Sequence, residues 1–192
     1  MSLKRLVLGG EGGQGVQTVA EVLAEAGYRS GLESLYIPSF GVEQRGGVSL
    51  AFVQLGDEPI AAPRFQKADV VVALSDRALE RTAGYVGRHS IFIYESSAAP
   101  DPARLPRDTG RILPLPAVRL VSEGLHPRVF NILILGALVE VVGMVGSDEI
   151  KRALEDRLGY RFVRQPELRE LNLRALEMGQ EAARELLRRA QN

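Results

Sequence analysis

The chain of 192 residues contains no cysteine and only two histidines. Without cysteine it forms no disulfide, holds no cysteine-ligated iron–sulfur cluster and offers no thiol nucleophile. His89 and His126 are far apart and lack the spacing of metal ligands, so a histidine-rich metal site is not expected. No acid–base pair stands out either. We therefore predict no metal ligands and no catalytic residue in this chain.

An excess of charge of either sign is also missing. Lysine and arginine together number 24, as do aspartate and glutamate, so the formal net charge is zero. Binding to nucleic acid or to an anionic membrane surface usually requires a basic excess, and neither partner is expected here. The weak self-repulsion of a neutral chain favours association with partner proteins, or with itself when it is isolated.

Long hydrophobic runs are absent as well. The longest apolar stretch, VFNILILGALVEVVGMVG (129–146), is interrupted by Asn131 and Glu140 and is short for a membrane span. The N-terminal residues MSLKRLVLGG contain too few apolar residues before the glycines for a signal peptide. We therefore expect a soluble, cytoplasmic protein.

The apolar segments that are present alternate between strand-like and helix-like patterns early in the chain and become helical later. This order predicts an α/β fold: a single Rossmann-like domain over residues 1–192, with a mostly parallel sheet, flanking helices and a helical C-terminus. We expect strands at 3–10, 33–38, 47–56, 68–75, 90–96 and 111–115, and helices at 14–29, after Ser75 or Asp76, and at about 127–143, 147–158 and 166–190.

Residues 9–16 read GGEGGQGV and lie between the first predicted strand and the first predicted helix. They fit the pattern G-x-G-x-x-G, in which backbone N–H groups approach a phosphate at the helix N-terminus. The alternative is a tight strand-to-helix turn without a ligand. The second strand ends without a carboxylate for ribose, which disfavours NAD, and no Walker A lysine is present. The candidate ligand-binding residues are Gly10, Gly12, Gly13, Gln14, Gly15 and Thr18.

A second glycine-rich segment connects the second and third predicted strands. It places Glu43 and Arg45 among Gly41, Gly46 and Gly47. Because it follows the second strand, it should lie at the same carboxyl edge of the sheet as the first turn, where open α/β sheets bind ligands. The alternative is a surface hairpin with an incidental charge pair.

Together these segments resemble the gamma subunit, or gamma domain, of the 2-oxoacid:ferredoxin oxidoreductases, the group of pyruvate, 2-oxoglutarate, branched-chain and indolepyruvate enzymes. The likeness covers essentially the whole chain, and its first two motifs together are more specific than G-x-G-x-x-G alone. The matching elements are the G-x-GGQGV turn, the S-x-G-x-E-x-R-GG loop from Ser39, the DEPI segment (57–60), the strand ADVVVAL, the helix NILILGAL from Asn131, and a closing helix with Asn172, Ala175 and Gly179.

The resemblance implies a complex that oxidatively decarboxylates a 2-oxoacid, forms an acyl-CoA and passes electrons to ferredoxin. Thiamine diphosphate, Mg and iron–sulfur clusters would then lie in partner subunits: alpha and beta subunits and a ferredoxin-like subunit or ferredoxin. In some members the glycine turn helps to bind coenzyme A. Some pyruvate enzymes have a lysine just past the turn, whereas this chain has TVAEV (18–22).

Several residue roles stay open at this point. Arg45 can grip a phosphate, or Glu43 and Arg45 can pair with a partner subunit. Asn131 and Asn172 either satisfy buried backbone groups or point toward a ligand. A stand-alone module that binds a nucleotide or acyl-CoA is the alternative function. Surface positions without a special role are expected for His89, Arg161, Arg164 and Arg169, and a structural role for His126.

Overall fold

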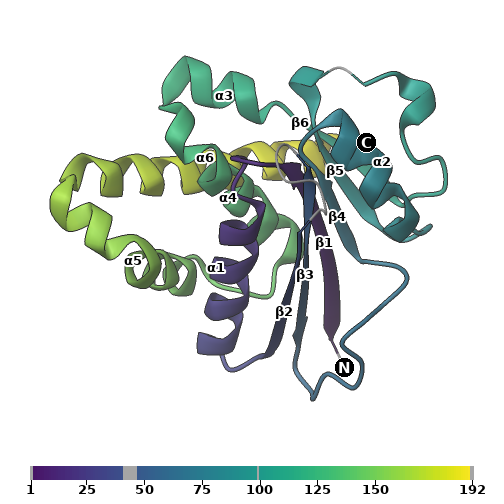
Figure 1. Cartoon of the computed structure of the whole chain (residues 1–192), viewed down its shortest axis with the longest axis horizontal. Helices are drawn as coiled ribbons and strands as arrows, with labels where there is room; N and C mark the ends of the chain where they lie inside the picture. Colours follow the sequence, from purple (N-terminus) through teal and green to yellow (C-terminus); the bar gives the residue numbers. More distant parts are fainter. Residues whose placement is uncertain (1, 41–46, 99, 191–192) are drawn as a thin grey trace.

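A computed structural model describes residues 2–40, 47–98 and 100–190. Within these ranges the chain forms a six-stranded sheet with the order β2-β3-β1-β4-β5-β6, and helices cover both of its faces (Figure 1). The strands are β1 (Leu3–Glu11), β2 (Glu33–Ser39), β3 (Val48–Gly56), β4 (Val70–Ala73), β5 (Ile91–Glu95) and β6 (Arg111–Leu115). The α-helices are α1 (Val16–Arg29), α2 (Asp76–Thr82), α3 (Ala117–Gly124), α4 (Phe130–Val142), α5 (Ser147–Arg164) and α6 (Pro166–Arg189). Short 3-10 helices are η1 (Ala83–Tyr85), η2 (Ser96–Ala98), η3 (Pro102–Arg104) and η4 (Pro127–Val129).

The sheet is mostly parallel, as the sequence predicts. Strands β1, β4, β5 and β6 run parallel to one another, while β3 lies antiparallel between β1 and β2. Strands β2 and β3 are therefore paired as a hairpin. Because β2 has the same direction as β1, both strands end at the same edge of the sheet. The predicted α/β fold with a helical C-terminus is confirmed.

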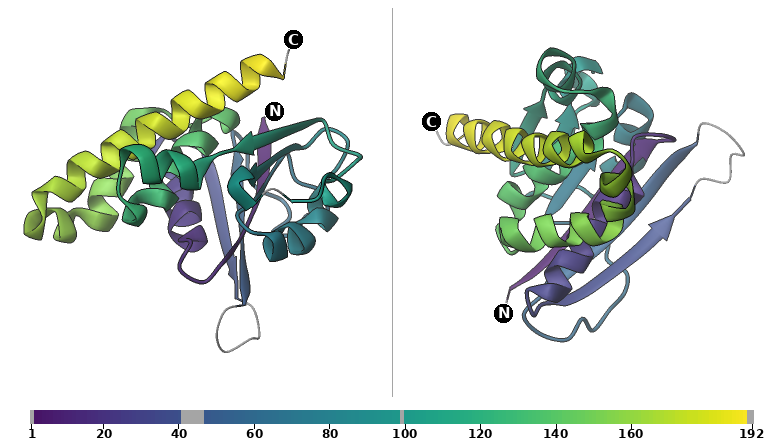
Figure 2. Two further views of the ribbon diagram at one scale, coloured as in Figure 1. Left: turned by 90° about the horizontal axis from the view of Figure 1, so that it is seen from above. Right: turned by 90° about the vertical axis from the view of Figure 1, so that its left-hand side faces the viewer.

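Alternating side chains of the central strands build a separate core on each face of the sheet. Leu6 and Leu8 pack with α1, α4 and α6 on one face, while Val7 between them packs with α2 on the other. This strict alternation follows from the two-residue period of a strand. The first core is the larger, and Figure 2 shows α6 running along that side as a long rod that joins α5 in a protruding hairpin.

Helix α4 is buried over most of its length, because α1, α3 and α6 pack around it. Its crossing with α6 depends on two glycines. A Cβ atom at Gly136 would lie 2.0 Å from the carbonyl oxygen of Leu176, and one at Gly179 would lie 2.0 Å from that of Leu133. The two backbones therefore approach more closely than any side chain at either position would permit.

Several boundaries differ from the sequence-based expectation. Strand β1 includes Gly9 and Gly10, as predicted, and continues one residue further to Glu11, which pairs with Val48 of β3. Helix α5 continues to Arg164 instead of ending near residue 158, anchored by the buried ring of Phe162. Strand β4 is shorter than predicted.

Helix α3 was not expected at all. The buried carboxylate of Glu95, at the end of β5, accepts a hydrogen bond of 3.1 Å from the N–H of Val118 in its first turn. The same carboxylate accepts hydrogen bonds of 3.0 Å from the N–H and hydroxyl of Ser97. The start of this helix thus depends on a residue more than twenty positions earlier, which a local pattern does not reveal.

Candidate functional site

The carboxyl ends of β1 and β4 form a switch point in the sheet. The two strands are neighbours, with Gly9 opposite Ala73, and the N–H of Leu74 donates to the carbonyl of Gly9 at 3.0 Å. From β1 the chain enters α1 on one face, and from β4 it enters α2 on the other. Connections that diverge in this way leave a crevice outside the strand ends, the usual ligand position in open α/β folds.

Two glycines in the turn after β1 have backbone angles that other residues rarely adopt. The φ angle is 94° at Gly13 and 72° at Gly15, both in the left-handed region. A Cβ at Gly15 would also lie 2.7 Å from that of Asn131. Gly12 differs from both: its φ is not in that region, and no atom of the described residues lies within 4 Å of where its Cβ would be. The fold therefore requires glycine at 13 and 15 but not at 12.

The side chain of Gln14 fastens this turn to the sheet. Its Oε1 accepts a hydrogen bond of 2.7 Å from the N–H of Glu11, and its Nε2 donates to the carbonyl of Leu74 at 2.9 Å. Both ends of the amide are therefore engaged within the chain. Gln14 therefore positions the turn, and the second N–H of its Nε2 forms no hydrogen bond with any other described residue.

The N-terminus of α1 remains uncapped among the described residues. Gly15 occupies the N-cap position, no side chain caps it, and the first turn contains no acidic residue. Such a helix end presents unpaired backbone N–H groups and a partial positive charge, which together favour an anion.

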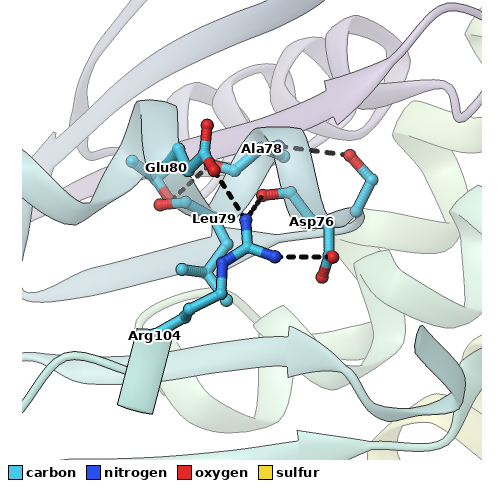
Figure 3. Close-up of polar contacts among 7 residues, drawn as sticks. Asp76, Ala78, Leu79, Glu80 and Arg104 are labelled. Atoms are coloured by element: carbon cyan, nitrogen blue, oxygen red, sulfur yellow. Dashed lines mark hydrogen bonds and ion pairs between the residues drawn. The ribbon is translucent and has the colours of Figure 1, made fainter. Parts of the chain in front are cut away.

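The neighbouring helix α2 is already neutralised at its N-terminus. Ser75 caps it by accepting a hydrogen bond from the N–H of Ala78, and Asp76 lies in its first turn. Arg104 reaches across from η3 and binds Asp76 at 2.7 Å and Glu80 at 2.6 Å (Figure 3). The hydrogen bond to Asp76 raises the pKa of Arg104, which stays charged. At this edge α1, rather than α2, is the better anion receptor.

A cavity of about 650 Å³ lies beside the first turn of α1, between α4, α5 and α6. Thr18 and Asn131 line it, so the structure brings these two predicted site residues together at the turn. Asn172 also lines it, with its Nδ2 donating to the carbonyl of Leu168 at 2.6 Å. Arg128, Arg157 and Arg161 complete the polar lining.

Sequence reasoning did not single out this cavity. Arg161 is exposed, as predicted, together with Arg164 and Arg169, but it also faces the cavity. Arg161 is four residues after Arg157, so both lie on one face of α5, and this spacing could have indicated a shared basic site from the sequence. Arg128 comes from η4, and only the packing of α1 and α6 against both α4 and α5 brings it there.

The second glycine-rich segment is described only at its ends. Glu43, Arg45 and Gly46 lie outside the described residues, as does Gly41. Gly47 is half-buried and precedes β3 directly. Ser39 pairs with Leu50, and Val48 pairs with Glu11 at the end of β1. The ends of this segment therefore lie at the edge that carries the glycine turn.

The remaining candidates have local roles. His89 is exposed and accepts a hydrogen bond from its neighbour Arg88, and the ring of His126 accepts one from the N–H of Arg128 at the start of η4. No cluster of three or more potential metal ligands occurs among the described residues. In the same ranges, none of the helices has the length and apolar character needed to span a bilayer.

The fold and the turn define an α/β protein whose first helix can receive an anion at the switch point of its sheet. Residues 5–182 match the family described as "Pyruvate ferredoxin/flavodoxin oxidoreductase". The chain belongs to this family, which confirms the resemblance seen in its motifs.

Individual relatives agree with this assignment. The chain is 32% identical over 181 residues to the ketoisovalerate oxidoreductase subunit VorA of Methanothermobacter thermautotrophicus, covering 94% of this chain and 36% of that protein. It is 30% identical to the 2-oxoglutarate synthase subunit KorC of Methanocaldococcus jannaschii, and there the match covers 95% of both chains.

A solved structure has the same fold. It is the 2-oxoglutarate:ferredoxin oxidoreductase from Magnetococcus marinus with 2-oxoglutarate, coenzyme A and succinyl-CoA bound. The TM-score is 0.86 at 25% identity, and the match covers 96% of this chain and 31% of that one. The chain thus spans about a third of the VorA and Magnetococcus proteins but nearly all of KorC.

Proposed function

We propose that the chain is the gamma subunit of a thiamine-diphosphate-dependent 2-oxoacid:ferredoxin oxidoreductase, which converts a 2-oxoacid to an acyl-CoA. The observation that carries this proposal is the end-to-end match to KorC, a subunit of 2-oxoglutarate synthase that has nearly the same extent. The reaction centres would lie in partner subunits: thiamine diphosphate and Mg with the alpha and beta subunits, and iron–sulfur clusters with a ferredoxin-like subunit or ferredoxin. This division agrees with the lack of cysteine in the chain.

Within such a complex, the role of this chain would be to hold coenzyme A through the turn at 10–15. The uncapped N-terminus of α1 supplies backbone N–H groups for the pyrophosphate, and Thr18 adds a hydroxyl on the next turn. Asn131 packs against Gly15 and keeps the turn in position. The Magnetococcus relative contains coenzyme A and succinyl-CoA, which supports the proposal. When bound, coenzyme A supplies the thiol that accepts the acyl group.

Two roles for the second glycine-rich segment are compatible with the proposed function. Glu43 and Arg45, which lie outside the described residues, either contact coenzyme A or pair with a partner subunit. The segment that contains them follows the end of β2 and precedes the start of β3. Gly47, at the start of β3, would let the chain enter the strand beside the turn.

A variant at Gly12 tests the turn without disturbing the fold. Gly13 and Gly15 are unsuitable because their backbone angles make any substitution strained. Gly12→Val places its side chain in open space, so we expect the thermal midpoint to stay unchanged. A ligand at the turn would meet the new side chain, and the affinity for coenzyme A should fall at least tenfold, as measured by isothermal titration calorimetry on the full chain.

Gly84→Val is the matched control. Gly84 is also exposed with open space around its missing Cβ, but it lies in η1, near the start of β4 and away from the turn. The affinity of the Gly84→Val variant for coenzyme A should equal that of the wild type. Unchanged binding in the Gly12 variant would contradict the proposed role of the turn.

The alternative is a stand-alone module that binds a nucleotide or acyl-CoA without thiamine-dependent partners. The uncapped N-terminus of α1 by itself fits either function. Co-expression with the reading frames beside its gene distinguishes them. The gamma-subunit function requires co-purification with a thiamine-diphosphate-binding chain and a cysteine-rich chain. Tight ligand binding by a chain that associates with neither would support the alternative.

A further inference from the structure

The cavity beside α1 has the size and lining of a small-molecule site. Its volume of about 650 Å³ is within the usual range for ligand pockets, roughly 300–1,000 Å³. It lies beside the glycine turn, because Asn131 lines it and a Cβ at Gly15 would lie 2.7 Å from that of Asn131. The lining residues are Thr18, Arg128, Val129, Asn131, Ile132, Arg157, Leu158, Tyr160, Arg161, Phe162, Leu168 and Asn172.

The charges on this lining are all positive among the described residues, since three arginines contribute and no carboxylate does. Arg157 forms an ion pair with Glu21 on α1, so its charge is already balanced. For Arg128 and Arg161, no ion pair with any described carboxylate is present. An anion entering the cavity would therefore find two guanidinium groups whose charge is uncompensated.

Arg161 is held in place without losing that charge. Its Nε donates to the hydroxyl of Tyr160 at 2.8 Å, and its guanidinium carbon lies 5.5 Å from the centre of the same ring. The terminal nitrogens are left for a ligand. Guanidinium groups bind phosphate through paired N–H donors, which makes two such groups a strong receptor for a dianionic phosphate.

The neutral polar groups of the cavity are also available. The side chains of Thr18 and Asn131 form no hydrogen bond with any other described residue, although both are half-buried. Half-buried polar groups of this kind are stabilised by water or by a ligand. Leu158, Leu168 and Phe162 supply apolar surface beside them, as a nucleoside would require.

We propose that this cavity binds the 3′-phosphoadenosine end of coenzyme A, with Arg128 and Arg161 recognising the 3′-phosphate. The inference rests on the proposed function, in which the adjacent turn holds the pyrophosphate. It adds a selectivity that the turn cannot supply, because a helix N-terminus accepts any phosphate. NAD and ATP have no 3′-phosphate, so the two arginines would discriminate against them.

The test compares coenzyme A with dephospho-coenzyme A, which lacks only the 3′-phosphate, on the full chain by calorimetry. The wild type should bind coenzyme A at least tenfold more tightly, and adenosine 3′,5′-bisphosphate should compete. In the double variant Arg128→Gln/Arg161→Gln this preference should fall to less than twofold. Arg164→Gln is the matched control: Arg164 is exposed near the end of the same helix but does not line the cavity, so the preference should persist.

The outcomes distinguish a failure of the cavity proposal from a failure of the turn proposal. Equal wild-type affinities for the two cofactors, both weakened by Gly12→Val, would overturn the cavity proposal and leave the turn as the cofactor site. Competition by the bisphosphate that depends on the two arginines, with no effect of Gly12→Val, would support the cavity and contradict the turn. A double variant that keeps the preference but loses partner subunits would show that the arginines bind protein, which overturns the proposal. No binding of coenzyme A or of the bisphosphate would overturn both.

Discussion

At the scale of single residues, the amide of Gln14 connects the glycine turn to two strands. It accepts from the N–H of Glu11 and donates to the carbonyl of Leu74, at the ends of β1 and β4. The hydrogen bonds thereby set the distance between the turn and the switch point.

Gln14→Leu keeps a similar side-chain size but leaves both backbone groups without their partner. We expect the free energy of unfolding to fall by about 1–3 kcal/mol, as for the loss of partly buried hydrogen bonds. Urea denaturation measures this change. Gln165→Leu is the control, since Gln165 is exposed and should change stability by less than about 0.5 kcal/mol. Equal free energies of unfolding for the two variants would show that the two hydrogen bonds of Gln14 contribute nothing to stability.

The glycines of the turn show which single-residue roles the sequence pattern predicts and which it does not. The pattern G-x-G-x-x-G marks all of them as equivalent ligand-approach positions. In the structure Gly10 is a strand residue whose Cβ would lie 2.6 Å from the side chain of Val16, whereas Gly12 has open space. Only tertiary neighbours separate a glycine required by packing from one that leaves room for a ligand.

At the scale of elements, the crossing of α4 and α6 is the contact most sensitive to substitution. Gly136→Ala would insert a methyl group at the carbonyl of Leu176, where backbone cannot move aside as a side chain can. The helices must separate, and we expect a loss of about 3 kcal/mol in the free energy of unfolding. Chemical denaturation followed by circular dichroism measures it.

Gly159→Ala controls for the effect of alanine itself. Gly159 is in α5 with no described atom within 4 Å of its missing Cβ, so alanine should stabilise the helix by about 0.5–1 kcal/mol. The two substitutions should therefore have opposite signs. A stabilising Gly136→Ala would mean that the two helices are not in close contact in solution.

Element boundaries were predictable where the signal is local. The sequence predicts a helix after Ser75 or Asp76, and Ser75 accepts the hydrogen bond that caps α2. Helix α3 was not predicted, because its N-cap residue Pro116 forms no side-chain capping hydrogen bond that a local pattern would indicate. The carboxylate of Glu95, on β5, accepts the hydrogen bond from its first turn instead. The antiparallel direction of β3 is likewise a result of tertiary pairing between β1 and β2.

At the scale of the whole molecule, the chain by itself should not oxidise 2-oxoacids. It has no cysteine for iron–sulfur clusters, and under the proposed function thiamine diphosphate would lie in partner subunits. With added thiamine diphosphate, Mg, coenzyme A and a 2-oxoacid, we expect no reduction of a viologen dye by the chain alone. The same assay with the co-expressed partner subunits should show reduction. Comparable rates without partners would contradict the subunit role.

The sequence by itself determined the fold class, the family, and the edge of the sheet at which the two glycine-rich segments end. These depend on local information: the periodicity of apolar residues, turn chemistry, and motifs contained in short segments. Tertiary structure alone decided that Asn131 packs against Gly15, that Gln14 is engaged by backbone groups, and that Arg128 and Arg161 face one cavity. The residues of that cavity come from α1, η4, α4, α5 and α6, and no short-range pattern specifies how helices so distant in sequence pack together.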